Sequence, residues 1–114
     1  MRMWMIPPGL LCDKHLLGEH GEIHKHRHNF VKGHSIAGRI SPVVQIEPQS
    51  MKKRHDVLSV EMRLRGMNHK SPYVQPDVSS YPVVYVNQTQ SMLDLRERCK
   101  DCKKRIEAYF NINT

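Results

Sequence analysis

Apolar residues recur along three stretches of the chain at the spacing of roughly 3.6 residues that one face of an α-helix requires. The first stretch predicts a helix over residues 8–30, with Pro8 suited to the first turn. Its expected core side consists of Leu10, Leu16, Leu17 and Ile23. A polar-edged face is made of Leu11, His15, Glu19, Glu22 and Lys25. Gly18 and Gly21 weaken this helix intrinsically, which indicates a close approach of some other group to its backbone.

The second stretch predicts a helix from Ser50, as N-cap, to Arg65, with Gly66 placed to terminate it. Its apolar stripes are Met51, His55, Leu58 and Met62 on one side, and Val57, Val60 and Leu64 on another. The third stretch predicts one continuous helix that starts at Ser91, where Asp94 stands at capping-box spacing. Its apolar stripe is Met92, Leu95, Cys99, Cys102, Ile106 and Tyr109.

The segments between these helices are interrupted by glycine and proline and show little helical period. Short extended pieces are expected only at residues 43–46 and 81–86. A connection as long as residues 67–90 inside a compact domain is usually functional or poorly ordered. The pattern as a whole predicts a mostly α, compact single domain over residues 1–114, with three main helices and long loops.

The composition narrows the function. A chain of 114 residues is too short for a barrel of eight strands and helices, which needs roughly 250. Its 18 Lys and Arg against 11 Asp and Glu give +7, which indicates a polyanionic partner and above all nucleic acid. No run approaches the roughly 20 apolar residues of a membrane span. With three cysteines, an odd number, we expect a soluble cytoplasmic protein with no membrane partner.

Metal binding is considered and not favoured. Cys99 and Cys102 form a CxxC pair, but both lie on an apolar stripe, where free cysteine behaves as a small buried hydrophobe. Cys12 is expected on a distant helix, which leaves too few ligands for a zinc site. His24, His26 and His28 are expected at a solvated helix end, in phosphate contact or simply exposed. No metal site and no cofactor are therefore expected, and a zinc module using these cysteines and histidines stays a weaker alternative.

Charge on the second helix leaves two interpretations open. Its basic residues are Lys52, Lys53, Arg54, Arg63 and Arg65. They form either a solvated helix face or a set of phosphate contacts. The net charge of +7 supports phosphate contact about as strongly as a solvated face. On the first helix, His15, Glu19 and Glu22 stack along one edge, an arrangement typical of surface ion pairs and also of catalytic groups.

The motif DKHLLGEHGE at residues 13–22 resembles the first helix of the pyrimidine-dimer DNA glycosylases, the phage endonuclease V family. The similarity extends to Met1-Arg2, to residues 51–66 and to residues 68–72, about two-thirds of the chain. It is greatest to the branch whose members begin Met-Arg-x-Trp. The resemblance implies a compact helical domain that acts in DNA repair by base excision.

The family's chemistry is covalent catalysis by the α-amine of the first residue, here Met1, because a methionine followed by bulky Arg2 is generally retained. The amine, with an ordinary pKa of about 8, attacks C1′ of the damaged nucleotide and displaces the base. The resulting imine permits β-elimination, so a glycosylase is also an abasic-site lyase. By resemblance, Glu22 stabilises the cationic sugar or imine and assists proton transfer. No metal is implied.

The expected partner is double-stranded DNA, bound by a monomer. The residues expected to contact DNA or substrate, by resemblance or by charge, are Arg2, His15, Glu19, Lys25, Lys52, Lys53, Arg54, His69 and Lys70. Two departures from the best-studied family member concern the lesion: Gly21 replaces an arginine, and the C-terminus lacks its aromatic and basic tail. They leave open an alternative, a non-catalytic basic DNA-binding or inhibitor module on the same scaffold.

Overall fold

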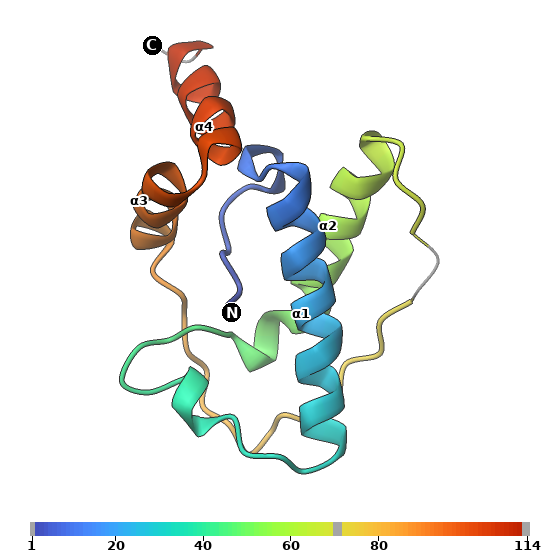
Figure 1. The fold of residues 1–114 in the computed structure, drawn as a ribbon. Coiled ribbons are helices and arrows are strands. Elements are labelled where there is room, and N and C mark those ends of the chain that lie inside the picture. The colour runs from blue at the N-terminus through green and yellow to red at the C-terminus, as the bar shows by residue number, and fades with distance from the viewer. Residues whose placement is uncertain (1, 70–71, 113–114) are drawn as a thin grey trace.

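Helices account for most of the chain in the computed structural model, which describes residues 2–69 and 72–112 (Figure 1). The α-helices are α1 (Asp13–Val31), α2 (Met51–Leu64), α3 (Gln88–Arg98) and α4 (Lys100–Ile112). Short 3-10 helices are η1 (Pro8–Leu10), η2 (Ala37–Arg39) and η3 (Pro48–Ser50). The described residues contain no strand, so the pieces expected at 43–46 and 81–86 join no sheet. The prediction of a mostly α fold is confirmed.

The helix expected from residue 8 begins later, because the chain makes the 3-10 turn η1 and then extends through Leu11 and Cys12. Cys12 is the N-cap of α1, and its sulfur accepts a hydrogen bond from the backbone N–H of His15. The prediction that Leu17 faces the core is wrong: it is 47% exposed, whereas Leu11 is completely buried. Other segments cover the side of α1 that was expected to be a polar edge, and this turns Leu17 toward solvent.

Helix α2 follows its prediction closely. It begins after Ser50 and ends at Leu64, with Gly66 in the left-handed region at φ +78°. That conformation lets the N–H of Met67 reach the carbonyl of Met62, which satisfies an otherwise unpaired group at the helix end. One predicted stripe, Met51, His55, Leu58 and Met62, is buried. The other, Val57, Val60 and Leu64, is exposed.

The prediction of one continuous C-terminal helix is wrong. Helix α3 begins before the expected position, because the side chain of Asn87 caps it by accepting from the N–H of Gln90. It ends at Arg98, since Cys99 is extended at φ −131° and ψ 113°, and α4 starts at the next residue. The break changes the direction of the second half of the apolar stripe. Cys102 and Ile106 are buried, whereas Tyr109 is 48% exposed.

Two helix pairs build the molecule: α1 packs on α2, and α3 packs on α4 (Figure 1). Between them runs the N-terminal segment, in which the N–H of Met3 donates to the carbonyl of Gln45 at 2.8 Å. The most deeply buried apolar side chains come from all of these parts: Met3, Ile6, Leu11, Leu16, Ile23, Ile46, Met51, Leu58 and Leu95. None of the described helices is long and apolar enough to cross a bilayer.

Candidate active site

A cavity of about 210 Å³ opens where the N-terminal segment crosses α1. Its lining residues are Arg2, Trp4, Lys14, His15, Gly18, Glu19 and Glu22. Gly18 contributes open space, since a Cβ added there would meet no atom within 4 Å. The sequence predicted that some other group approaches the backbone at Gly18. None of the described residues does so, and the open space beside Gly18 is part of the cavity. Arg2 and Glu22 therefore border the same cavity.

Glu22 is 8% exposed and lies against a histidine one helical turn away. The carboxylate Oε2 is 3.6 Å from Nε2 of His26, which is itself buried. Burial lowers the pKa of the His26 imidazole, and the neighbouring Glu22 charge opposes that shift. His26 was expected at a solvated helix end, and that expectation is wrong because α1 turns it inward beside Glu22. A carboxylate that is nearly buried but borders a cavity is suited to stabilise a cation or move a proton.

Arg2 is held by α3 rather than projecting into solvent. Its Nη2 donates to Oγ of Ser91 at 2.8 Å, and its Nη1 lies 3.4 Å from Oδ2 of Asp94. The guanidinium also lies over the Trp4 ring, 4.5 Å from the centroid. Sequence reasoning missed these two partners, because Ser91 stands 89 positions after Arg2 and Asp94 follows it on the same helix. Met1, expected to carry the reactive amine, lies outside the described residues.

Glu19 and Arg54, both expected to contact DNA or substrate, lie inside the protein, although Glu19 also lines the cavity. Both side chains are buried, and they form a paired interaction in which Nε and Nη2 of Arg54 donate to the two carboxylate oxygens at 2.6 and 2.9 Å. Arg54 also donates from Nη1 to the carbonyl of Ile6 at 2.7 Å. The pair joins α1, α2 and the N-terminal segment. Of the basic run on α2, Lys52 and Lys53 are therefore exposed, whereas Arg54 is buried.

His15 points toward sulfur atoms as well as toward the cavity. Its Nδ1 lies 3.2 Å from Sγ of Cys12 and 3.5 Å from Sγ of Cys102, and the ring makes an edge contact with Trp4. Cys12 Sγ is also 3.7 Å from Cys99 Sγ, so the expectation that Cys12 is remote from the CxxC pair is wrong. Burial raises the pKa of the Cys102 thiol to about 12. These four side chains are close enough together to hold one metal ion.

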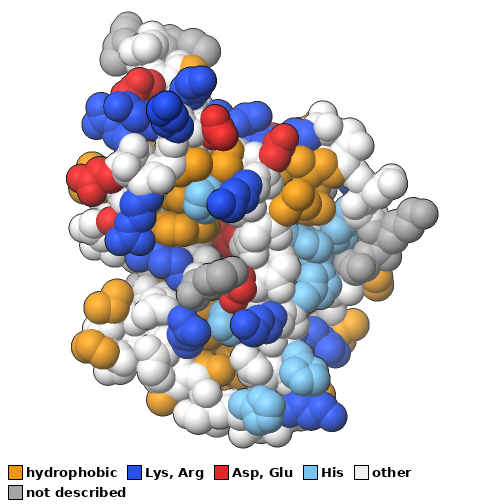
Figure 2. Space-filling model, viewed as in Figure 1, with side chains coloured by type: hydrophobic (Ala, Val, Ile, Leu, Met, Phe, Trp, Pro, Cys, Tyr) orange, Lys and Arg blue, Asp and Glu red, His pale blue; other side chains and the backbone are white. Residues whose placement is uncertain are grey.

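A second cluster consists of His20, His24, His55 and His69, drawn from α1, α2 and the segment after α2. Figure 2 shows histidine side chains gathered where α1 and α2 lie. Burial and the neighbouring histidines lower the pKa of His20 to about 4. His69, which is expected to contact DNA, belongs to this cluster, and its Nε2 lies 3.1 Å from Oγ of Ser59. His24, expected at a solvated end, also belongs to this cluster.

The remaining basic candidates are Lys25, Lys52 and Lys53, and all three are exposed. Lys52 forms an ion pair with Asp56 across one helical turn, at 2.9 Å, with both side chains about half exposed. Lys70 lies outside the described residues. Lys and Arg side chains are dispersed over the face drawn in Figure 2, so the positive charge is spread rather than concentrated on one helix.

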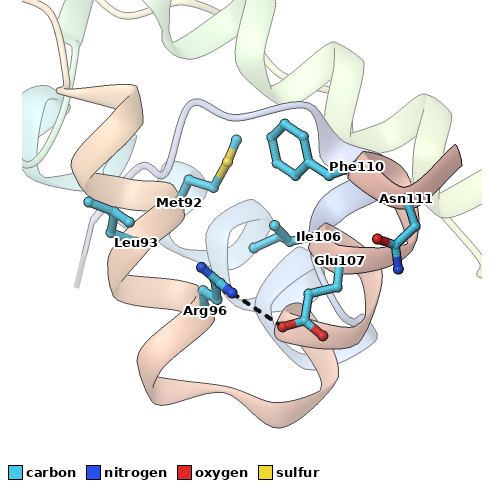
Figure 3. A pocket seen from close by; sticks show the side chains of 7 residues that line it. All are labelled: Met92, Leu93, Arg96, Ile106, Glu107, Phe110 and Asn111. Carbon is cyan, nitrogen blue, oxygen red and sulfur yellow. Dashed lines mark hydrogen bonds and ion pairs between the residues drawn. The ribbon is translucent and has the colours of Figure 1, made fainter. Parts of the chain in front are cut away.

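A larger cavity, about 480 Å³, lies between α3 and α4 (Figure 3). Its lining residues are Met92, Leu93, Arg96, Ile106, Glu107, Phe110 and Asn111. The ionisable groups among them, Arg96 and Glu107, form an ion pair at 3.4 Å and are about half exposed. Because such a pair is ordinary surface chemistry, the smaller cavity beside Glu22 is the better candidate for catalysis.

Comparison with known proteins gives one match. A family model described as pyrimidine dimer DNA glycosylase matches residues 1–75, which include the N-terminal segment, α1 and α2. Comparisons with curated proteins and with solved structures found no match. The matched region contains every residue that lines the cavity beside Glu22, whereas α3 and α4 lie beyond it.

Proposed function

The chain belongs to the pyrimidine dimer DNA glycosylase family, and from that premise we propose that it is a DNA glycosylase with abasic-site lyase activity. It excises damaged or modified pyrimidines, pyrimidine dimers by family resemblance, from double-stranded DNA and then nicks the strand. It acts as a monomer. The observation that carries the proposal is the cavity lined by both Arg2, which is covalently joined to Met1, and Glu22.

The proposed nucleophile is the α-amine of Met1. An α-amine has an ordinary pKa of about 8, so a useful fraction is unprotonated near neutral pH. Its lone pair attacks C1′ of the damaged nucleotide, and the bond from C1′ to the base breaks as the base takes up a proton. Loss of the amine proton and opening of the sugar leave an imine at C1′. Removal of a proton from C2′ then expels the 3′ phosphate by β-elimination.

Glu22 is proposed to act on the charged species in this sequence. Its carboxylate borders the cavity, and a negative charge there stabilises the positive charge that develops on the sugar and then on the imine. The same carboxylate accepts and returns protons during ring opening in this proposal. His26 supports it from the next turn of α1, at 3.6 Å, and so acts as a positioning residue.

DNA contact is proposed for the exposed lysines Lys25, Lys52 and Lys53. Lysines at these positions would contact phosphates whatever the DNA sequence. The affinity for DNA is therefore expected to fall strongly as the salt concentration rises. Chemistry at C1′ also requires access that a stacked duplex does not offer, and we therefore expect the enzyme to bend the DNA and extrude a nucleotide.

The test is reductive trapping of the imine with borohydride. Untagged protein is incubated with duplex DNA containing an abasic site, and separately with ultraviolet-irradiated duplex DNA. We expect a covalent adduct on both substrates, its loss when a peptide extension blocks the N-terminus, and its strong reduction in Glu22→Gln. Glu97→Gln serves as the matched control, because Glu97 is exposed on α3 and lines no part of the cavity beside Glu22.

Two results would contradict the proposal. One is the absence of an adduct on either DNA, with the protein shown to be folded by circular dichroism. The other is an adduct that persists with both the blocked N-terminus and Glu22→Gln, since the amine would then come from elsewhere. Salt-sensitive DNA binding without any adduct would support the alternative, a non-catalytic DNA-binding module.

A further inference from the structure

Two pairs of side chains with the same spacing meet beside the candidate active site. Cys12 is the N-cap of α1 and His15 follows three residues later, while Cys99 directly precedes α4 and Cys102 follows three residues later. Sγ of Cys12 and Sγ of Cys99 lie 3.7 Å apart although 87 residues separate them in the chain. All four potential ligand atoms lie within 4.8 Å of one another. The sequence therefore reads C-x-x-H followed, after a long interval, by C-x-x-C.

The distances match those between ligands of one tetrahedral ion. Zinc binds sulfur at about 2.3 Å and imidazole nitrogen at about 2.0–2.1 Å, which places S···S near ~3.8 Å and S···N near ~3.5 Å. Here S···S is 3.7 Å for Cys12 and Cys99, and S···N is 3.5 Å for Cys102 and 3.2 Å for Cys12, each to Nδ1 of His15. Two sulfurs thus lie close to the same imidazole nitrogen, and the third is within 4.8 Å of the other ligand atoms, an arrangement that burial of small hydrophobes does not require.

Backbone N–H donors surround the three sulfurs. Each sulfur accepts one backbone N–H: Cys12 from His15 at 3.5 Å, Cys99 from Cys102 at 3.4 Å and Cys102 from Cys12 at 3.3 Å. The amino-terminal ends of α1 and α4, which carry partial positive charge, both face the cluster. We propose that Cys12, His15, Cys99 and Cys102 bind one structural Zn²⁺ ion.

Such an ion would fasten the C-terminal helices to the helix that carries Glu22. The α3–α4 pair lies outside the matched family region, yet its residues Ser91 and Asp94 hold the guanidinium of Arg2. One metal joining the starts of α1 and α4 closes a long loop, where a crosslink restricts the unfolded chain most. The site also engages Nδ1 of His15, which leaves that nitrogen unable to act on substrate.

The test uses the full-length wild-type protein, purified reduced and without chelator, and replaces zinc by Co²⁺. We expect one Co²⁺ per chain to produce thiolate-to-cobalt charge-transfer absorption and the visible bands of a tetrahedral site. Zn²⁺ should abolish both by competition, and chelation should lower the melting temperature. Cys99→Ser should weaken the charge-transfer band, whereas His15→Cys, which retains four ligands, should preserve it. The matched control His28→Asn, at an exposed position on α1, should leave the spectrum unchanged.

The wild-type spectrum keeps the proposal falsifiable even where a variant fails to fold. Folded, reduced wild-type protein that gives no charge-transfer band with Co²⁺ would overturn the site. So would a disulfide between Cys12 and Cys99 found by mass spectrometry in freshly isolated protein, since a zinc-bound cluster keeps all three sulfurs reduced.

A cluster of four histidines, separate from the cysteine site, supports a second metal site. The rings of His20, His24, His55 and His69 converge, with centroid separations of 4.7 to 5.0 Å and potential ligand atoms within 4.8 Å of one another. Nε2 of His55 and Nε2 of His69 are 3.3 Å apart, the separation of about 3.3–3.4 Å expected for two imidazoles on one tetrahedral zinc. Nε2 of His20 and Nε2 of His24 are buried without a hydrogen-bond partner.

We infer that these four imidazoles bind a second divalent transition-metal ion, for which Zn²⁺ is the probe. Elemental analysis of the zinc-loaded wild-type protein should then give two ions per chain. His24→Ala should reduce the content to one ion while the cobalt charge-transfer band of the cysteine site remains, because imidazoles produce no such band. His34→Ala, at an exposed position after α1, is the control and should retain two. A single ion per chain accompanied by the full charge-transfer band would overturn this second site and leave the first intact.

Discussion

Replacement of Arg54 by methionine tests how much the buried pair with Glu19 contributes to the folded state. The side chain of Arg54 is 5% exposed and that of Glu19 is completely buried. Arg54→Met removes two charge-assisted hydrogen bonds, at 2.6 and 2.9 Å, and leaves the carboxylate desolvated and unpaired. Breaking a buried pair by removing one partner costs about 3–5 kcal/mol, and the lost bond to the Ile6 carbonyl adds to this.

Lys52→Met is the matched control on the same helix. Lys52 also pairs with a carboxylate, Asp56, at 2.9 Å, but the two side chains are 52% and 53% exposed. A surface pair of this kind contributes about 0–1 kcal/mol, since water and salt screen it. The double variant Glu19→Leu with Arg54→Met removes both buried charges, and we expect it to recover most of the stability lost in Arg54→Met.

The measurement is the free energy of unfolding in urea at neutral pH, followed by far-ultraviolet circular dichroism. We expect Arg54→Met to be less stable than Lys52→Met by at least about 2 kcal/mol. Equal decreases in the free energy of unfolding in the two variants would refute the reasoning, because burial would then not determine how much an ion pair stabilises the fold. The outcome bears on function, since Glu19 lies about one turn before Glu22 on α1 and both residues line the candidate cavity.

Three further predictions concern the cavity, the DNA contacts and a helix end. Gly18→Ala and Gly21→Ala should each stabilise α1 by about 0.5–1 kcal/mol in urea, because an added Cβ meets no atom within 4 Å at either position. Only Gly18 lines the cavity, so only Gly18→Ala should slow borohydride trapping; equal slowing in both would contradict this. Lys52→Gln with Lys53→Gln should reduce the slope of log binding constant against log salt by about 2, and an unchanged slope would exclude both phosphate contacts. Gly66→Ala should cost about 1–2 kcal/mol in urea, because its φ of +78° is strained for alanine, and unchanged stability would contradict that assignment.

Sequence features that act within a few residues, such as a terminating glycine or the spacing of apolar positions, were sufficient to predict local structure. The end of α2 before Gly66 followed the sequence, because a left-handed glycine at a helix end is determined by neighbouring backbone groups. Its start after Ser50 was also predicted, although the Ser50 side chain makes no capping hydrogen bond. The mostly α composition also followed, since apolar spacing reports which side of each helix is buried. The motif at residues 13–22, together with the matching segments at residues 1–2, 51–66 and 68–72, placed the chain in its family, which the match over residues 1–75 confirms.

Contacts between distant parts of the chain were decided only by the tertiary structure. Arg54 reads like its neighbours Lys52 and Lys53, and its burial depends on Glu19, 35 residues earlier. The helix breaks at Cys99 although the apolar stripe continues through that position in the sequence. The break brings Sγ of Cys99 to 3.7 Å from Sγ of Cys12, 87 residues earlier. Periodicity reports only that a position faces inward, whereas packing determines which other side chain it meets there. The sequence by itself therefore determined the helical class, the extent of α2 and the family. Packing determined where the C-terminal helix breaks and which charges and sulfurs share a site.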